Sequence, residues 1–372
     1  MKKILIVFGT RPEAIKMAPL VKEFQKHPTV FDTKVCVTAQ HREMLDQVLD
    51  FFNVTPDYDL DLMKPGQNLY GLTADIITNL KPVLEGFEPD YVFVHGDTTT
   101  TMAGSIASFY SGAKVCHVEA GLRTHNKLSP FPEEINRQIT GRVCDYHFAP
   151  TTTSKANLLK ENIQEDTILV TGNTVIDALL DSVERVNQEP SELINDLSTT
   201  LGDKELILVT GHRRENHGAG FIRICEALKE IAQDNTDRLI VYPVHLNPKV
   251  QEPVKRILTD VANVLLIDPL AYQDFIWMMN RSKIIITDSG GVQEEAPSLG
   301  KPVLVMRDTT ERPEAVDAGT VILVGTNKDL IVTEALDLLN NATRFQQMSL
   351  LHNPYGDGKA CKRIVDFIRH LA

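Results

Sequence analysis

The chain has 372 residues, a length that suits two domains better than one core. Its composition, 42% hydrophobic and 24% charged, is typical of a soluble globular protein. The formal net charge of -12 argues against a nucleic-acid-binding protein, which usually has a basic face, so we expect no nucleic acid as a partner.

The sequence gives no signal for export or for a membrane span. The apolar run Ile4–Phe8 follows two lysines but is too short for a signal peptide, and Arg11 comes soon after it. No stretch approaches the ~18 apolar residues of a membrane helix. The five cysteines are scattered and form no C-x-x-C pair, which favours free thiols in a reducing compartment. We therefore expect a cytoplasmic protein with no membrane partner.

Short apolar strands alternate with amphipathic helices in the first half of the chain. The strands are continuous runs rich in Val, Ile and Leu, as in parallel strands covered on both faces. The pattern predicts strands at Lys3–Phe8, Lys34–Ala39, Tyr91–His95, Lys114–Val118, Tyr146–Ala149 and Ile168–Thr171. It predicts helices at Pro12–His27, Arg42–Phe52, Leu69–Leu84, Thr100–Tyr110 and Glu133–Val143.

The second half repeats this scheme. Strands are predicted at Leu206–Thr210, Leu239–Pro243, Val264–Ile267, Ile284–Thr287, Pro302–Met306 and Val321–Val324. Helices are predicted at Phe221–Asp234, Pro248–Asp260, Tyr272–Asn280, Val292–Leu299 and Asp329–Asn340. Two such runs indicate an α/β protein with two doubly wound domains.

The expected domains are residues 1–172 and 173–355. The segment Val186–Asp203 has no clear apolar period and is interpreted as a connection between them. The tail, residues 356–372, is predicted to form a helix at Lys359–Leu371 that packs back on the first domain.

Polar motifs follow the predicted strands, where ligands bind in doubly wound sheets. The first is Gly9–Lys16, in which Arg11 and Lys16 lie near the start of a helix whose free N–H groups attract an anion. An ordinary turn with solvated charges is the alternative. The chain contains neither G-x-x-x-x-G-K-[ST] nor G-x-G-x-x-G, so ATPase and NAD-dependent functions lose their usual support.

Three acidic residues are candidates for proton transfer. Asp97 follows a strand in H-G-D-T-T-T-T, where a helix cap is the alternative. Glu119 ends an apolar strand, where a carboxylate is costly unless it is paired, for example with Arg123, or functional. Glu133 lies in a predicted first helical turn, where the helix dipole favours an acid in any case.

Further candidates lie in the second half. His212 and Arg213 follow a strand, and an arginine there suits a diphosphate, although a solvated loop is the alternative. His245 follows another strand and is either a core histidine or a ligand contact. Ser289, Gly290 and Gly291 precede a helix and can cradle a phosphate, and Glu295 can reach a ribose diol. The charged stretch Arg307–Glu314 is either part of this site or a solvated loop, and no ligand spacing for a metal is present.

Nine motifs in chain order resemble those of the bacterial non-hydrolysing UDP-N-acetylglucosamine 2-epimerases. They extend nearly end to end and are far more specific together than any one alone. They are F-G-T-R-P-E-A-I-K-M-A-P-L, T-A-Q-H-R-E-M-L-D-Q, H-G-D-T-T-T-T, H-V-E-A-G-L-R-T, P-F-P-E-E-I-N-R, T-G-H-R-R-E-N, P-V-H-L-N-P, D-S-G-G-V-Q-E-E-A and T-E-R-P-E-A.

The resemblance implies a GT-B fold, with two Rossmann-like domains facing a central cleft, and a homodimer without cofactor or metal. It implies reversible C2 epimerisation of UDP-N-acetylglucosamine (UDP-GlcNAc) to UDP-N-acetylmannosamine (UDP-ManNAc), for synthesis of cell-surface polysaccharide precursors. UDP leaves C1 as the C2 proton is lost, giving 2-acetamidoglucal, and is then added back. A C2 hydrogen becomes removable as C1 gains cationic character, and its return on the opposite face needs more than one acid/base group.

The resemblance also assigns roles position by position. Asp97, Glu119 and Glu133 match catalytic carboxylates, without a division into acid and base, and His212 matches a histidine that assists the leaving diphosphate. The implied substrate and UDP contacts are Arg11, Lys16, Arg213, Tyr272, Phe275, Ser289, Gly290, Gly291, Glu295 and Arg312. Some relatives have a second, regulatory site, matched here by Gln40, His41, Arg213 and His245, but Glu43 and the segment 64–67 depart from the pattern there.

Four alternatives remain open at this point. A hydrolysing epimerase would release free ManNAc and UDP, and an epimerase for another UDP-2-acetamido sugar would share many of these motifs. A glycosyltransferase of the same fold would need an acceptor. A regulatory nucleotide-binding module would gain little from several acids at strand ends.

Overall fold

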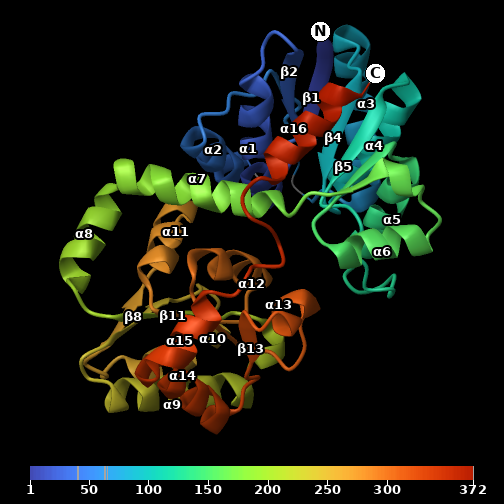
Figure 1. Cartoon of the computed structure of the whole chain (residues 1–372). Coiled ribbons are helices and arrows are strands. Elements are labelled where there is room, and N and C mark those ends of the chain that lie inside the picture. Colours follow the sequence, from blue (N-terminus) through green and yellow to red (C-terminus); the bar gives the residue numbers. More distant parts are fainter. Residues whose placement is uncertain (40–41, 63, 65, 372) are drawn as a thin grey trace. The chain divides into compact units, whose positions relative to one another are not determined.

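The computed structural model of the chain describes residues 1–39, 42–62, 64 and 66–371. The chain divides into two compact units, which are Met1–Ala178 with Tyr355–Ala372, and Leu179–Pro354. Each unit contains one parallel sheet flanked by helices (Figure 1). The domain limits at 172 and 355 stay predictions.

The sheet of the first unit is parallel, with the strand order β3-β2-β1-β4-β5-β6-β7. The order reverses between β1 and β4, and a ligand of a doubly wound sheet binds beside such a reversal. Continuous apolar runs form the centre, and Ile4–Phe8 of β1 is fully buried. The strands are β1 (Lys2–Phe8), β2 (Phe31–Val37), β3 (Tyr58–Asp59), β4 (Tyr91–His95), β5 (Lys114–Val118), β6 (Tyr146–Ala149) and β7 (Ile168–Val170).

Two rows of helices pack on this sheet. One row contains α3, α4 and α5, and the other contains α2, α1 and α16 (Figure 1). The C-terminal helix α16 is fixed at its end because Lys2 Nζ donates a 2.8 Å hydrogen bond to the Ile368 carbonyl. The helices are α1 (Arg11–Gln25), α2 (Arg42–Phe51), α3 (Leu69–Phe87), α4 (Thr99–Ser111), α5 (Glu133–Val143), α6 (Thr152–Lys160), the 3-10 turn η1 (Glu165–Thr167), α7 (Thr174–Gln188), which continues into the second unit, and α16 (Ala360–His370).

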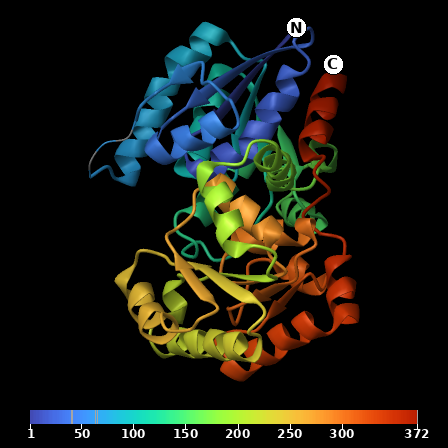
Figure 2. The same cartoon turned by 90° about the vertical axis from the view of Figure 1, so that its left-hand side faces the viewer.

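The second unit has a parallel sheet with the order β10-β9-β8-β11-β12-β13. Its strands are β8 (Leu206–Thr210), β9 (Leu239–Pro243), β10 (Val264–Ile267), β11 (Ile284–Thr287), β12 (Val303–Val305) and β13 (Val321–Leu323). The helices α10, α9 and α14 pack side by side (Figure 2). The helical segments are α8 (Glu192–Leu201), η2 (Arg214–Asn216), α9 (Ala219–Asp234), α10 (Pro248–Leu258), α11 (Tyr272–Arg281), α12 (Gly290–Glu295), η3 (Ala296–Leu299), α13 (Pro313–Asp317), α14 (Lys328–Asn340) and α15 (Ala342–Ser349).

The interpretation of Val186–Asp203 as a connection without an apolar period is wrong. The segment contains the end of α7 and all of α8, which Ser191 caps by accepting from the Ile194 N–H. Ile194, Leu197 and Leu201 are buried at helical spacing. The helix α7 was also not predicted, although it is 15 residues long. The strand β3 and the helices α6, α13 and α15 were not predicted either, and each of them is short.

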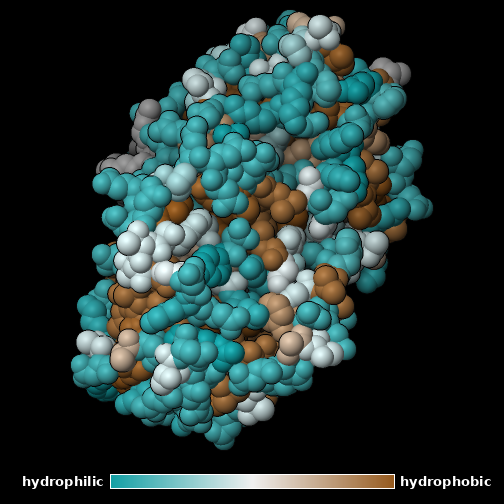
Figure 3. Space-filling model, turned by 60° about the vertical axis from the view of Figure 1, so that its left-hand side comes forward, coloured by the Kyte–Doolittle hydropathy of each residue, from teal (hydrophilic) through white to brown (hydrophobic). Residues whose placement is uncertain are grey.

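The surface agrees with the composition of the chain. The face drawn in Figure 3 is mainly hydrophilic, with apolar residues in scattered groups. All five cysteines are free. Among the described residues, no helix combines the length and the apolar character that a membrane span requires.

Candidate active site

The turn between β1 and α1 is built around Glu13. Gly9 is required there because a Cβ would lie 2.0 Å from Thr38 Oγ1. Thr10 caps α1 and Glu13 completes a capping box, with Glu13 Oε2 accepting from the N–H groups of Gly9 at 3.1 Å and Thr10 at 2.8 Å. Glu13 is only 2% exposed, so this acid is structural, and the exposed Arg11 beside it stays a predicted substrate contact.

Asp97 lies in the turn after β4 and does not cap the next helix. That cap is Thr98, whose side chain accepts from the Thr101 N–H. The Asp97 carboxylate instead pairs with Arg137, with 2.8 Å between Oδ2 and Nη2. Burial raises the pKa of Asp97, against the opposing charge of Arg137. The side chain can therefore hold a proton more readily than an ordinary aspartate.

Glu119 directly follows β5 and has a left-handed backbone, at a φ of 62°. It does not pair with Arg123, which binds Glu161 with 2.6 Å between Nε and Oε1. Glu119 Oε2 instead contacts the Lys16 ammonium and lies 3.6 Å from His95 Nε2. Burial alone would raise the pKa of Glu119, but Lys16 and His95 together bring it well below its ordinary value. Glu119 is therefore ionised at neutral pH.

Glu133 is the first residue of α5, and its environment differs from that of Glu134 beside it. Glu134 is fully buried and accepts backbone N–H groups from Thr124 at 3.0 Å and His125 at 3.1 Å, so it has a structural role. Glu133 Oε2 is buried without a hydrogen-bond partner among the described residues. Such an atom is costly unless a ligand uses it.

The structure brings these three acids to one site in the first unit. The charges of Glu119 and Glu133 both act to raise the pKa of Asp97, while Arg137 and Lys16 act to lower it. Arg137, His95 and Asn173 also belong to this cluster and were missed in the sequence. Their signal was weak, since His95 lies inside a strand and Arg137 inside a helix, where polar residues are usually structural, and Asn173 lies in a short turn outside the quoted motifs.

In the second unit, the loop after β8 is held by Asp288, a residue that was not among the predicted site residues. Asp288 is fully buried, and its Oδ2 accepts from the N–H groups of His212 at 2.9 Å and Arg213 at 2.8 Å. Arg213 Nε also donates to the Asp288 carbonyl at 3.1 Å. These bonds order the loop, which argues against the alternative of a solvated loop.

His212 and His245 come together although 33 residues separate them in the sequence. Their rings stack with centroids 5.0 Å apart and planes 13° apart. Asp288 Oδ1, which is buried, lies 3.8 Å from His212 Nδ1. Gln40 and His41, predicted beside His245 in the regulatory site, lie outside the described residues.

Ser289, Gly290 and Gly291 form the turn into α12. Arg312 lies over this turn, because a Cβ on Gly290 would be 3.2 Å from the Arg312 guanidinium carbon. Arg312 Nε donates to Glu294 Oε1 at 2.7 Å. A Cβ on Gly291 would be 3.2 Å from Glu295 Oε1, so both glycines keep space for neighbouring polar groups.

The stretch Arg307–Glu314 is partly exposed, but it is anchored by Arg307. Arg307 has a side chain only 5% exposed and bridges Glu215 and Glu311, at 2.8 Å and 2.6 Å. The bond to Arg307 lowers the pKa of Glu311 to about 2.

Tyr272 and Phe275 lie on the first turn of α11 and are half-buried. Burial raises the Tyr272 pKa, and its hydroxyl lies 3.4 Å from Ser182 Oγ. Both rings stay predicted uracil contacts.

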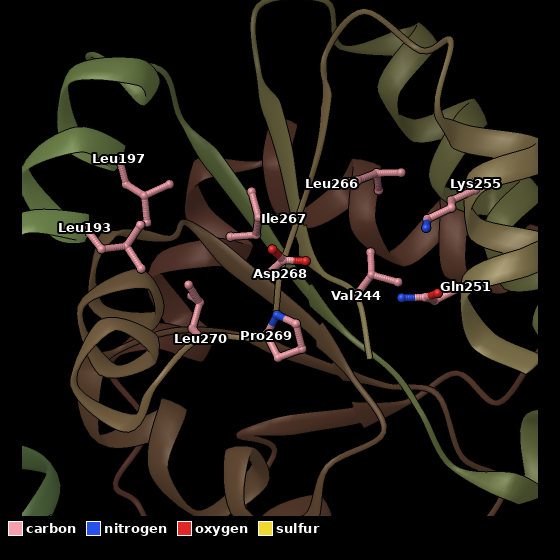
Figure 4. Close-up of a pocket in the computed structure, with 10 residues that line it drawn as sticks. All are labelled: Leu193, Leu197, Val244, Gln251, Lys255, Leu266, Ile267, Asp268, Pro269 and Leu270. Carbon is pink, nitrogen blue, oxygen red and sulfur yellow. The ribbon is translucent and has the colours of Figure 1, made fainter. Parts of the chain in front are cut away.

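A separate pocket of about 440 Å³ lies in the second unit (Figure 4). It is bordered by α8, by α10 and by the loop that follows β10, and contains none of the predicted site residues. Its walls are mainly apolar, with Gln251, Lys255 and Asp268 as the polar exceptions. Among the described residues, no group of three or more His, Cys, Asp or Glu side chains is placed to hold a metal.

The chain resembles known proteins along almost its full length. The family model for UDP-N-acetylglucosamine 2-epimerase matches residues 22–369. The UDP-N-acetylglucosamine 2-epimerase of Escherichia coli K12 is 60% identical over 371 residues, covering 99% of this chain and 98% of the relative.

Solved structures agree with this result. UDP-GlcNAc 2-epimerase from Neisseria meningitidis, bound to UDP-GlcNAc, superposes with a TM-score of 0.86 at 52% identity, covering 98% of this chain and 99% of that one. The structure of UDP-GlcNAc 2-epimerase from Methanocaldococcus jannaschii superposes with a TM-score of 0.87 at 34% identity. The match covers 99% of this chain and 100% of that one. The two parallel sheets with alternating helices form the GT-B-like fold that the resemblance implied. The chain therefore belongs to the UDP-N-acetylglucosamine 2-epimerase family.

Proposed function

We propose that the chain is a non-hydrolysing UDP-N-acetylglucosamine 2-epimerase that interconverts UDP-GlcNAc and UDP-ManNAc for cell-surface polysaccharide precursors. The observation that carries the proposal is the cluster of Asp97, Glu119 and Glu133, in which burial raises the pKa of Asp97 while Lys16 and His95 bring that of Glu119 below its ordinary value. Groups whose pKa values are pushed apart are typical of acid/base catalysis.

The first half of the reaction breaks two bonds of the sugar. The C1–O bond gives its electron pair to the UDP oxygen, and an acid/base carboxylate takes the C2 proton, leaving the C1–C2 double bond of 2-acetamidoglucal. Glu119, held ionised by Lys16, suits the role of a carboxylate that stabilises positive charge at C1 or accepts a proton. Asp97, with its raised pKa, suits a group that takes up and releases a proton during the reaction.

The second half reverses these steps on the opposite face of C2. A proton is delivered to C2, and UDP oxygen adds back to C1, so the overall reaction consumes no water and releases no free sugar. We assign to His212 the role of assisting the departing diphosphate. The backbone N–H of His212 is held by a hydrogen bond to Asp288.

We assign UDP to the residues that line the loops of the second unit. Arg213 and Arg312 supply positive charge, and Ser289, Gly290 and Gly291 supply a turn with little side-chain bulk. In this proposal Glu295 binds the ribose diol, Tyr272 and Phe275 hold the uracil, and Arg11 and Lys16 are substrate contacts.

We further propose a cytoplasmic homodimer. The five free cysteines suit a reducing compartment. Helix α4 exposes two adjacent aromatic side chains, with Phe109 62% and Tyr110 74% exposed, and such a pair suits a subunit contact. Gln40, His41 and His245 remain the candidates for a regulatory UDP-sugar site.

The test is incubation of the purified protein with UDP-GlcNAc alone in D₂O, followed by proton NMR. We expect UDP-ManNAc to appear, with deuterium at C2 of both UDP-sugars and no accumulation of free sugar. Free ManNAc in place of UDP-ManNAc would mean a hydrolysing enzyme. Turnover of a UDP-diacetamido uronate but not of UDP-GlcNAc would mean a different substrate, and retention of hydrogen at C2 would exclude proton exchange.

A further inference from the structure

Asn173 is a buried polar residue next to the acidic cluster that none of the assigned roles explains. It lies between β7 and α7 and is only 3% exposed. Its Nδ2 donates to Glu119 Oε2 at 2.8 Å. Residues 119 and 173 come from different strand ends, so only the folded sheet brings them together.

The orientation of the Asn173 amide is determined by its second hydrogen bond. Asn173 Oδ1 accepts from the Val175 N–H at 3.0 Å. A backbone N–H can only donate, so the atom that meets it must be the oxygen. The amino group therefore faces Glu119, and it can meet only an acceptor there.

The backbone at this position is also tightly held. The Asn173 N–H donates to the Tyr355 carbonyl at 2.7 Å. Gly172 has a φ of 88°, and a Cβ there would lie 3.2 Å from the Cα of Gly356. The two segments thus approach too closely for side chains, and this contact gives the amide a rigid base.

The donors around Glu119 meet only one of its two oxygens. Within the part of the chain that the structure describes, Lys16, Asn173 and, at 3.6 Å, His95 all approach Oε2. Oε1 receives no hydrogen bond from a described residue. Because Glu119 Oε2 is held by these donors, Glu119 Oε1 is the oxygen that can contact a substrate.

We propose that Asn173 is a positioning residue that holds Glu119 as an oriented carboxylate and presents its Oε1 to the sugar. This assignment rests on the proposed function, since Glu119 must first take part in the reaction. Lys16 supplies the charge that keeps Glu119 ionised, and Asn173 adds a neutral, directional bond that fixes which oxygen is used.

The substitution Asn173→Asp separates this role from that of a helix cap. Aspartate has the same shape and still accepts the Val175 N–H, but it replaces the donor facing Glu119 by a second carboxylate oxygen. Like charges at this distance favour a shared proton, so the pKa of Glu119 should rise. The other charged or titratable groups facing Glu119 are Lys16 on α1, His95 at the end of β4 and Asp97 in the turn after it, and all are unchanged.

We expect Asn173→Asp to lower kcat by about tenfold to a hundredfold with little change in KM, the scale for a misplaced reacting group. In a plot of kcat against pH, the acid limb should move to higher pH, because the pKa of Glu119 is expected to rise. Asn173→Ala, which removes the donor without adding a charge, should lower kcat with a smaller shift of that limb. Wild-type kcat and an unshifted profile in Asn173→Asp would overturn the proposal.

Thermal unfolding tests the contact without relying on activity. We expect Asn173→Asp to lower Tm, and Glu119→Gln added to it to recover part of that loss, because the glutamine amide can donate to the new carboxylate. Tm losses that simply add in the double variant would mean that the two side chains do not interact. If the wild type shows no epimerase activity but the Tm losses do not add, the proposed function fails while the contact stands.

Discussion

The imidazole rings of His212 and His245 stack face to face, with centroids 5.0 Å apart. The His212 side chain is 50% exposed, so few neighbouring groups restrict the orientation of its ring. His245 therefore restricts the ring that we assign to the departing diphosphate.

Removal of this stack should affect His212 more than the fold. We expect His245→Ala to lower kcat by about tenfold, since a catalytic ring that loses its orientation spends less time in a reactive position. His245→Phe keeps a flat ring and should retain most of the activity. The measurement is the initial rate of UDP-ManNAc formation, and equal losses in both variants would show that the stack does not position His212.

Each of the three clustered acids should be needed for turnover. We expect Asp97→Asn, Glu119→Gln and Glu133→Gln each to lower kcat by ~100-fold or more, the scale for a positioned acid/base group. UDP affinity, measured by calorimetry, should change little because the assigned UDP contacts lie elsewhere. A variant with near-normal kcat would remove that residue from the mechanism.

Glu13 should be a determinant of stability. Its Oε2 accepts two backbone N–H groups and the Thr10 hydroxyl, and its Oε1 accepts from the hydroxyls of Thr98 and Thr101. Glu13→Gln turns one acceptor into a donor in a buried site, and we expect a loss of about 2–4 kcal/mol in the free energy of unfolding. Denaturant titration measures it, with the exposed Glu85→Gln as the control. A loss no larger than that of the control would contradict a structural role.

Acid should destabilise the protein through buried histidines. Burial lowers the pKa of His117 from 6.5 to about 3 and that of His147 to about 4. The unfolded chain therefore binds protons that the folded chain does not, and stability falls as the pH drops from about 6.5 toward 3. We expect Tm to fall across this range.

The variant His117→Gln isolates one of these groups. Glutamine can still donate to the Gly96 carbonyl, which His117 Nε2 approaches at 2.7 Å, but it does not titrate. We expect its Tm to depend less steeply on pH than that of the wild type. Parallel curves would mean that His117 is not the source of the acid sensitivity.

The sequence by itself determined the two α/β units and the position of most strands. Buried parallel strands such as Ile284–Thr287 are continuous apolar runs, and this pattern is local. It also placed Asp97, Glu119 and His212 at strand ends, because ligand-binding residues of such folds follow strands. The amphipathic helix α8 was missed although its apolar spacing is present in the sequence.

Only the tertiary structure decided which charges meet. Glu119 pairs with Lys16, 103 residues away, and not with the nearby Arg123, which binds Glu161 instead. Asp288 holds the loop of His212 across 76 residues, and Asn173 reaches Glu119 across 54. Strand order determines these contacts, and because it depends on packing between distant segments, local sequence spacing does not contain it.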